Sequence, residues 1–590
     1  MIFPDEEFSS LPRLYHLDDY ERCLSGRGLY CLGSFVVEPQ SSGYSLLKEY
    51  SSDPLHFDHT YLHRGYCVSS RCPHTAPEPN TTQRFQLCAQ HWGNQRKLHL
   101  KLQTLHYCRR RHDVKMEGDM TVPQLVFLVI VVVLLAMNAA GTAYDVMTGD
   151  DVKKNQMVVA WSVRENWRRL TSRRQHADPR LAAMAPLQGV RVVVLGSVMW
   201  THAGFVQHLL FVLNPRDLSQ MTSSWWMMPV KNGTALVQIF MMMSSFLLAN
   251  NLLLLPKLNG LLPKLVMLRY IRLAPVHLLV VGFAASWWER LRGGPVWPAA
   301  VGAEAASCRR KFWTQALYIN NLVEPEDTCL VQTWSLAVDM QLHLVAAALT
   351  LGLHRWRHRA VTILSVLLLA SCVLNGALAY VFHWKTMLYI MTPENLRTMF
   401  RDEPSFWWWY TSPWGSLPAC LIGLIMAHVH YNLQEQKVQP KDYRWLRWLY
   451  HLYFPLALCW AFSGAWLLPH DSRLTVAIHA AIERPVMTLL SALVVFGVCN
   501  NFDGVVRDLF SWPGWRVLSR LSLPALMLHW SVNLLLVAAQ PLPIPSSLLE
   551  MICDFISTWF LSYLLATPVS LLVELPAQRL AAALFSRSQQ

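Results

Sequence analysis

The sequence predicts a polytopic α-helical membrane protein of about eleven transmembrane helices, with a small disulfide-rich amino-terminal ectodomain. Three observations predict this class. Hydrophobic residues make up 53% of the 590 residues and charged residues only 15%, a composition that a soluble globule cannot bury. The apolar residues gather in runs of the roughly 20 residues that a helix needs to cross a bilayer. The first part of the chain, by contrast, is polar and contains six cysteines.

Composition divides the chain into five consecutive parts. We expect a cysteine-rich non-cytoplasmic domain, a first transmembrane helix, a basic cytoplasmic linker, a ten-helix membrane domain and a short cytoplasmic tail. Their predicted limits are 1–118, 119–146, 147–187, 188–580 and 581–590. The expected spans lie near residues 122–143, 190–212, 235–256, 273–288, 330–352, 360–382, 413–432, 449–468, 485–501, 521–539 and 555–573.

The amino-terminal part has an even number of cysteines, as disulfide-bonded domains of oxidising compartments do. We predict that they pair, although the sequence does not choose among the possible pairings. Zinc binding has less support because no two close cysteine pairs form a ligand set, and we predict no metal site. A further disulfide is expected in one outer loop. The candidates are Cys23, Cys31, Cys67, Cys72, Cys88 and Cys108 in the domain, and Cys308 and Cys329 in the loop.

Basic residues of the connecting loops predict the orientation, because cytoplasmic loops carry an excess of Lys and Arg. Placing segment 147–187 inside puts 22 basic residues on that side and 12 on the other. The amino-terminal domain is then non-cytoplasmic, and sequons at Asn80 and Asn232 fall outside as candidate glycosylation sites. Residues 1–10 lack the features of a secretory signal, so either the first span translocates the domain or the chain begins further upstream. The plasma membrane and the endoplasmic reticulum both fit this topology.

Two ionisable residues interrupt the first span of the ten-helix domain. Arg191 and His202 are eleven positions apart, which on a helix is about 16 Å and close to three turns, so both lie on one face. Ionisable groups within a bilayer are costly and therefore indicate function by default. The alternative is that Arg191 snorkels at the membrane edge and His202 only packs and forms a hydrogen bond.

Other ionisable residues of the spans are secondary candidates. Arg269 and Arg272 flank a helix entry on the inner side, where anchoring the helix is the competing role. Asp339 lies within an apolar span and should meet an arginine, a histidine or water. His529 ends the run LSRLSLPALMLH, and Glu574 is predicted to end the last span.

In their order along nearly the whole chain, these features resemble the nose resistant to fluoxetine group of the acyltransferase 3 family. The amino-terminal motifs are DDYERCLS, GLYCLGSF and LHRGYCVSSRCP. The membrane-domain motifs are the spacing of Arg191 and His202, then LRYIRLAP, LYINN, TWSLAVDMQLHL, YTSPW with CLIGL, LSRLSLPALMLH and VELP. Four positions depart from the family pattern. Gln188 replaces a usual acidic residue, Ser245 a glycine, and Ser412 and Ser416 basic residues.

The resemblance implies a membrane-embedded O-acyltransferase that moves an acyl group from acyl-CoA to a lipid or another membrane-accessible hydroxyl. His202 would then be the base, with Arg191 holding an anionic part of the donor. Arg269, Arg272, Asp339 and His529 would bind or position the substrates. The expected partners are acyl-CoA as co-substrate, membrane lipids, and a lipid or hydrophobic small-molecule acceptor, with no bound cofactor.

Two alternatives remain open at this point. The four departures are compatible with a carrier or receptor for lipids or hydrophobic small molecules that has lost catalysis. The ectodomain is alternatively an interaction module held on a membrane scaffold. The sequence contains no Walker loop, no Rossmann fingerprint, no HExxH and no nucleic-acid-binding motif, so ATP-driven transport, metalloprotease chemistry and nucleic-acid binding lack support.

Overall fold

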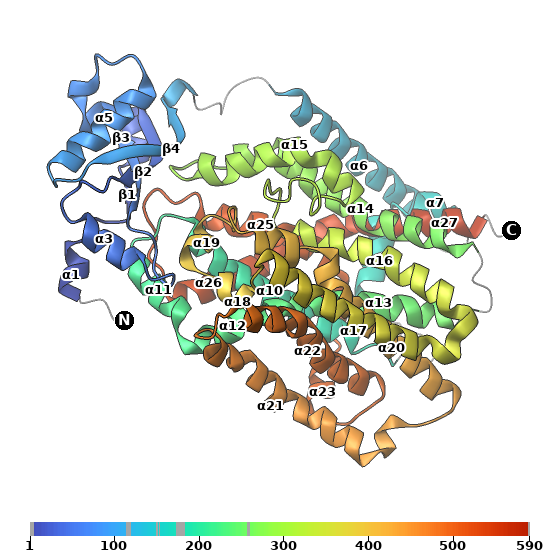
Figure 1. Cartoon of the computed structure of the whole chain (residues 1–590). Coiled ribbons are helices and arrows are strands. Elements are labelled where there is room, and N and C mark those ends of the chain that lie inside the picture. The colour runs from blue at the N-terminus through green and yellow to red at the C-terminus, as the bar shows by residue number, and fades with distance from the viewer. Residues whose placement is uncertain are drawn as a thin grey trace.

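The computed structural model describes residues 5–113, 120–148, 152, 154–172, 183–255 and 260–587. A sheet-containing amino-terminal domain lies at one end of a large helical bundle, and the carboxyl-terminal end of the chain lies at the other (Figure 1). The sheet-containing domain and the helical bundle are separate parts of the described structure. The predicted boundary at residue 118 lies outside the described residues.

The ectodomain is built on a four-stranded mixed sheet, which the cysteine pattern alone did not predict. Its central strand β2 is the apolar run YCLGSFVV, in which all residues but one are buried, as expected of a strand covered on both faces. The strand order is β1-β3-β2-β4, parallel between β1 and β3 and antiparallel elsewhere. The elements are α1 (Asp5–Ser10), β1 (Tyr15–Leu17), α2 (Tyr20–Ser25), β2 (Tyr30–Val37), α3 (Tyr44–Ser51), β3 (Tyr61–Cys67), α4 (Val68–Arg71), α5 (Thr81–Asn94) and β4 (Leu100–Arg109).

All eight candidate cysteines form disulfides, as predicted. Cys31 and Cys108 are direct partners across β2 and β4, and their bridge joins the two strands. A second bridge ties helix α2 to the end of β3, and a third ties the segment after α4 to α5. The fourth lies in the loop before α16. The pairs are Cys23–Cys67, Cys31–Cys108, Cys72–Cys88 and Cys308–Cys329.

Each of the eleven predicted spans coincides with a helix. Judged by length and composition, the described residues contain eight candidate membrane-spanning segments, of which one, Thr333–Ile390, contains both α16 and α17. The eleven helices are α6 (Val122–Met147), α10 (Leu187–Leu209), α13 (Gln238–Leu253), α14 (Leu261–Ser286), α16 (Thr333–Leu353), α17 (Arg357–Phe382), α20 (Pro413–Glu435), α21 (Arg444–Leu467), α22 (Arg473–Cys499), α25 (Ser522–Val537) and α26 (Leu548–Val569).

Shorter helices connect these spans. The outer connections contain α11 (Pro215–Ser223), α12 (Met228–Asn232), α15 (Ala303–Leu317), α18 (Met387–Ile390) and α19 (Pro393–Arg397). Helices α7 (Gln156–Val159), α8 (Val163–Thr171), α23 (Val505–Ser511), α24 (Trp515–Arg520) and α27 (Leu575–Arg587) lie toward the opposite end. There, Arg579 of α27 donates hydrogen bonds to the carbonyl oxygen of Val159 and to Asn166, so the described part of the basic linker is packed against the bundle.

The ectodomain contacts loops that the charge pattern places on its own side of the membrane, and Phe57 lies near His208 at the end of α10, with ring centroids 6.1 Å apart. Tyr15 packs against Phe211, with ring centroids 5.0 Å apart, and the amide of Asp58 donates a hydrogen bond to Glu394. The hydroxyl of Tyr107 donates a hydrogen bond to the carbonyl oxygen of Pro295. These contacts agree with the predicted relative sidedness of the loops.

Two sequence predictions are wrong. Asn232 is buried, and its Nδ2 donates a hydrogen bond to the carbonyl oxygen of Trp460 at 2.9 Å, so the folded chain cannot accept a glycan there. Asn80 is exposed, and its glycosylation stays a prediction. Glu574 does not end the last span, because the helix continues through a π-helical turn, Ser570–Glu574, into α27.

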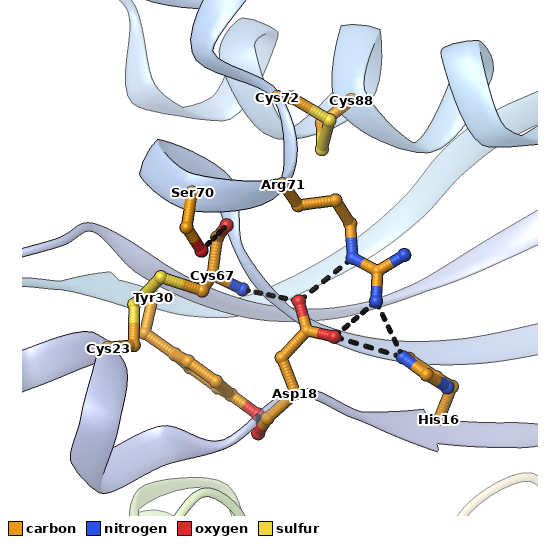
Figure 2. A network of polar contacts seen from close by, with 9 residues as sticks. All are labelled: His16, Asp18, Cys23, Tyr30, Cys67, Ser70, Arg71, Cys72 and Cys88. Carbon is orange, nitrogen blue, oxygen red and sulfur yellow. Dashed lines mark hydrogen bonds and ion pairs between the residues drawn. A yellow bond between two sulfur atoms is a disulfide. The ribbon is translucent and has the colours of Figure 1, made fainter.

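A partly buried acidic group joins β1 to the disulfide-bonded end of β3 (Figure 2). The carboxylate of Asp18 accepts hydrogen bonds from the guanidinium of Arg71, from the amide of Cys67 at 2.9 Å and from the ring of His16 at 3.0 Å. Burial alone would raise the pKa of Asp18, but the bonds from Arg71, His16 and Cys67 together hold it well below its ordinary value. The ionised form therefore stabilises the folded ectodomain.

We expect Asp18→Asn to destabilise the ectodomain by about 1–3 kcal/mol, because Arg71 loses its charged partner. A carboxyl group whose pKa is lowered on folding stabilises the fold above its unfolded pKa, and this stabilisation is lost as the pH falls. The wild type should therefore become less stable as the pH falls below about 4, so that its free energy of unfolding approaches that of Asp18→Asn. Temperature-dependent proteolysis of the ectodomain in the full-length protein measures this. Glu21→Gln, an exposed change of the same charge, is the control, and equal effects of the two substitutions would contradict the assignment.

Candidate active site

His202 lies beside a mostly apolar cavity in the middle of the bundle. Helix α10 is continuous from Leu187 to Leu209, so Arg191 and His202 keep the separation of about 16 Å that the sequence predicts. The cavity has a volume of about 60 Å³. Its polar lining consists of His202 with the hydroxyl groups of Ser197, Thr201, Ser335 and Tyr410 and the amide of Gln332. The apolar lining includes Phe205, Phe240, Trp334, Leu396, Met399, Phe400 and Phe406.

The structure brings His529 against His202. Nδ1 of His202 and Nε2 of His529 are 2.7 Å apart, and the two rings stack with centroids 5.0 Å apart. Nδ1 of His529 lies 2.6 Å from the carbonyl oxygen of Leu526, one turn earlier in α25. The two residues are 327 positions apart in sequence, so periodicity could not pair them.

This chain of contacts determines which nitrogen atoms carry protons. A carbonyl oxygen only accepts, so Nδ1 of His529 is the donor to Leu526 and its neutral Nε2 must accept. His202 then donates from Nδ1, which leaves Nε2 of His202 without a proton. Since His202 lines the cavity, the pair can present a proton acceptor to a molecule bound there.

A buried tryptophan packs edge-on against the same histidine. The ring centroids of Trp530 and His202 are 5.6 Å apart at an interplanar angle of 78°. The indole N–H of Trp530 donates to both carboxylate oxygens of Glu304, at 3.0 and 3.1 Å. Glu304 also accepts a hydrogen bond from the amide of Leu330, directly after the disulfide-bonded Cys329. Glu304 thus connects the disulfide-bonded loop to the residue that supports His202.

Aromatic side chains close the outer end of the cavity. Phe406 stacks on Phe400 with centroids 4.4 Å apart, and Phe400 in turn contacts Phe205 of α10. Met399 and Phe400 both have positive φ, 54° and 55°, a left-handed conformation that is strained for bulky residues. The segment holds this conformation at the cavity wall.

Three arginines gather at the inner part of the bundle. Arg191 of α10 lies within electrostatic range of Arg269 and Arg272, which are three positions apart and share one face of α14. We call these three residues the arginine cluster. Arg269 is ion-paired with Asp339 of α16 and donates to Ser244, so Asp339 meets an arginine as predicted. Within the described part of the chain, Arg191 and Arg272 form no hydrogen bond or ion pair with protein groups.

Like charges that share a low-dielectric site repel one another. An anionic ligand would relieve this repulsion, and guanidinium groups without a protein partner are suited to bind phosphate or carboxylate groups. The geometry therefore provides two separate features along α10: a histidine pair at the cavity and a cluster of arginines about three turns away.

The departures from the family pattern do not lie in the cavity wall. Ser245 donates a hydrogen bond to the carbonyl oxygen of Cys420, and a side chain at Gly423 would collide with its Oγ, so Ser245 belongs to the close packing of α13 on α20. Ser416 accepts a hydrogen bond from Arg484 of α22, which also lies over the ring of Trp409. Arg484 therefore places a positive charge next to Ser416, the position at which the family usually has a basic residue.

Sequence reasoning missed Glu304, Trp530 and Arg484. Glu304 lies in the connection between two predicted spans, and Arg484 directly precedes the predicted span 485–501. For Arg484 a signal was present, since a charged residue next to an apolar run is a candidate for function. For Glu304 no local signal exists, because its partners lie 26 and 226 positions away.

These features define an integral membrane protein with a polar site enclosed by its transmembrane helices. The chain belongs to the acyltransferase 3 family, whose acyltransferase domain matches residues 185–575. It is similar to nose resistant to fluoxetine protein 6 of Caenorhabditis elegans, with 24% identity over 336 residues that cover 54% of this chain. The match spans 39% of the length of that relative. No solved structure matches the chain significantly.

If His529 orients His202, then His529→Leu should lower turnover about 100-fold or more, within the range for loss of acid–base catalysis. His529→Gln should recover part of it, because an amide oxygen can still accept the proton of His202. Substrate KM should change little in both variants. Steady-state kinetics with thermal stability measured alongside tests this, and equal activity of the leucine variant and the wild type would refute the positioning role.

Burial raises the pKa of Glu304 to about 7, although the hydrogen bonds from Trp530, Leu330 and Val331 lower it. The folded protein therefore keeps this proton to a higher pH than the unfolded chain. Stability from this group is greatest below about pH 4.5 and is lost as the pH rises toward 7. Thermal unfolding between pH 4.5 and 8 should show this decline in the wild type and in Glu289→Gln, a half-exposed neighbour. Its persistence in Glu304→Gln would contradict the assignment.

Proposed function

We propose that the protein is an O-acyltransferase that moves an acyl group from a coenzyme A thioester to the hydroxyl of a membrane-accessible acceptor. The observation that carries the proposal is the arrangement along α10. The helix carries an imidazole nitrogen without a proton beside a mostly apolar cavity and, about three turns away, a guanidinium without a protein partner. Acyl transfer from a large anionic thioester needs both features.

In the proposed reaction, the acceptor oxygen attacks the thioester carbonyl carbon while Nε2 of His202 takes the hydroxyl proton. His529 stabilises the imidazolium that forms, through its hydrogen bond to Nδ1 of His202. The carbon–sulfur bond then breaks, and the leaving sulfur takes the proton back from His202. The products are the acyl ester and the free thiol, so no other reactant is required.

The arginine cluster would hold the phosphates of the donor. Arg191 and Arg272 are the two members without a protein partner, and Arg269 would add charge while paired with Asp339. The extended pantetheine arm of coenzyme A can bridge the distance from the cluster to His202. Donor phosphates then lie on the inner side, which fits the predicted topology of eleven spans with a non-cytoplasmic ectodomain.

The first test is turnover of radiolabelled acyl-CoA by purified protein in nanodiscs with mixed lipids. We expect a labelled ester from the wild type and a loss of about 100- to 10,000-fold in His202→Ala. His208→Ala is the matched control, because His208 is buried on the same helix and bonds only to the backbone oxygen of Gly204. Equal turnover of His202→Ala and wild type would remove His202 from catalysis. Uptake of labelled lipid without any ester would favour a carrier.

Removal of a cluster cation should weaken donor binding more than chemistry. We expect Arg191→Ala and Arg272→Ala each to raise KM for acyl-CoA by about 10- to 100-fold, the value of one charged hydrogen bond. The same acyl group carried by N-acetylcysteamine, a thioester without phosphates, should be used equally well by variants and wild type. A loss of equal size with both donors would show that the arginines do not bind the phosphates.

A further inference from the structure

A second hollow opens on the outside of the bundle next to the cavity at His202. It is a groove between α10, α12, α24 and α26 with a volume of about 540 Å³. None of its lining residues is charged. They are Val192, Val193, Gly196, Ser197, Trp200, Thr201, Pro229, Val230, Leu236, Trp515, Phe555, Ile556 and Trp559. We call this hollow the lateral groove.

The lateral groove faces the lipid phase. Both of its long walls, α10 and α26, belong to candidate membrane-spanning segments. Ile556 is 58% exposed and Val193 39% exposed, and at this depth exposed apolar side chains contact acyl chains. The groove floor depends on Gly196, because a Cβ there would lie 2.7 Å from Cζ3 of Trp559.

The lateral groove adjoins the cavity at His202. Ser197, Thr201 and Leu236 line both hollows. Ser197 and Thr201 donate their hydroxyl hydrogens to carbonyl oxygens of their own helix, at 3.1 and 3.0 Å. Their oxygen atoms can therefore still accept a hydrogen bond from the hydroxyl of a bound molecule. Thr201 directly precedes His202 in the chain.

The other two directions of approach are less suited to an uncharged acceptor. On the outer side, Phe400 and Phe406 close the cavity, and the segment that carries them is bonded to the ectodomain through Glu394. On the inner side lies the arginine cluster, which the donor phosphates would occupy. The lateral groove is the direction that leads from lipid to His202 past apolar and hydroxyl groups alone.

We propose that the acceptor is a neutral, hydroxyl-bearing lipid that enters sideways from the bilayer through the lateral groove. The proposal rests on the proposed acyl transfer and specifies its acceptor and route. The absence of charge in the groove excludes a charged headgroup as the preferred occupant, because burying it there without a partner is costly. The acyl chains stay among Phe555, Ile556 and Trp559 while the hydroxyl passes Thr201 to reach Nε2 of His202.

Binding can be tested apart from catalysis with a diacylglycerol analogue that carries a diazirine in one acyl chain. The wild type in phosphatidylcholine nanodiscs is photolabelled with and without excess dioleoylglycerol, and labelled peptides are mapped by mass spectrometry. We expect competable labelling on α10 and α26. Ile556→Trp, which fills the groove, should reduce it about tenfold, whereas Val366→Trp on the lipid-facing side of α17 should not.

Other outcomes overturn the proposal. Equal competition by excess phosphatidylcholine or by dioleoylglycerol would indicate ordinary boundary lipid. Equal labelling of both variants would exclude the groove as the route. In the turnover assay, Ile556→Trp should lose transfer to dioleoylglycerol, whereas Val366→Trp should keep it. If the wild type acylates a short water-soluble alcohol but not dioleoylglycerol, the acyl transfer stands and the lipid route falls. If it acylates neither, the proposed function fails, and the photolabelling still decides whether the groove binds lipid.

Discussion

The hydrogen bond between His202 and His529 is the interaction on which the site depends. Two imidazoles within a bundle of apolar helices are stable only if their polar atoms are satisfied, and each ring satisfies one atom of the other. The carbonyl oxygen of Leu526 takes the remaining N–H of His529. One nitrogen atom, Nε2 of His202, is left without a partner in this chain of contacts. The need to satisfy buried polar groups thus produces a reactive atom at one defined position.

The same constraint explains how distant parts of the chain are held around this pair. Glu304 satisfies the indole of Trp530 and the amide of Leu330 together, so an outer loop, a disulfide and a transmembrane helix meet at one carboxyl group. At the inner end, Asp339 neutralises Arg269 but not its two neighbours in the cluster. One region is therefore fully satisfied and rigid, and the other has capacity for an anion. The region around Glu304 therefore supports the site, whereas the arginine cluster is suited to bind an anion.

Much of the architecture was predictable because a bilayer permits few solutions. Apolar runs of about 20 residues predicted helices of the bundle, and the described residues contain eight segments that are long and apolar enough to span a membrane. The even cysteine number predicted the ectodomain disulfides. The sheet was not predicted, because β2 reads as a continuous apolar run, without the alternation that marks a half-exposed strand. For Asp339 and His529 the sequence predicted polar roles but did not identify their partner residues. The partner of His529 is 327 positions away, and no local pattern encodes such a distance.

The position of the ectodomain is explained by the loops that it contacts. Its contacts with Phe211, Pro295 and Glu394 reach three different loops, and the loop that carries Glu394 continues into the strained residues Met399 and Phe400 at the cavity wall. Strain of this kind persists only where surrounding structure enforces it. The disulfide-bonded sheet enforces this conformation from outside the membrane. There, water would otherwise compete for the hydrogen bonds between the ectodomain and the loops. Closure of the outer end then leaves the lipid side and the inner side as the two approaches to His202, one apolar and one cationic. A reaction between a membrane-dissolved hydroxyl and an anionic thioester needs that division.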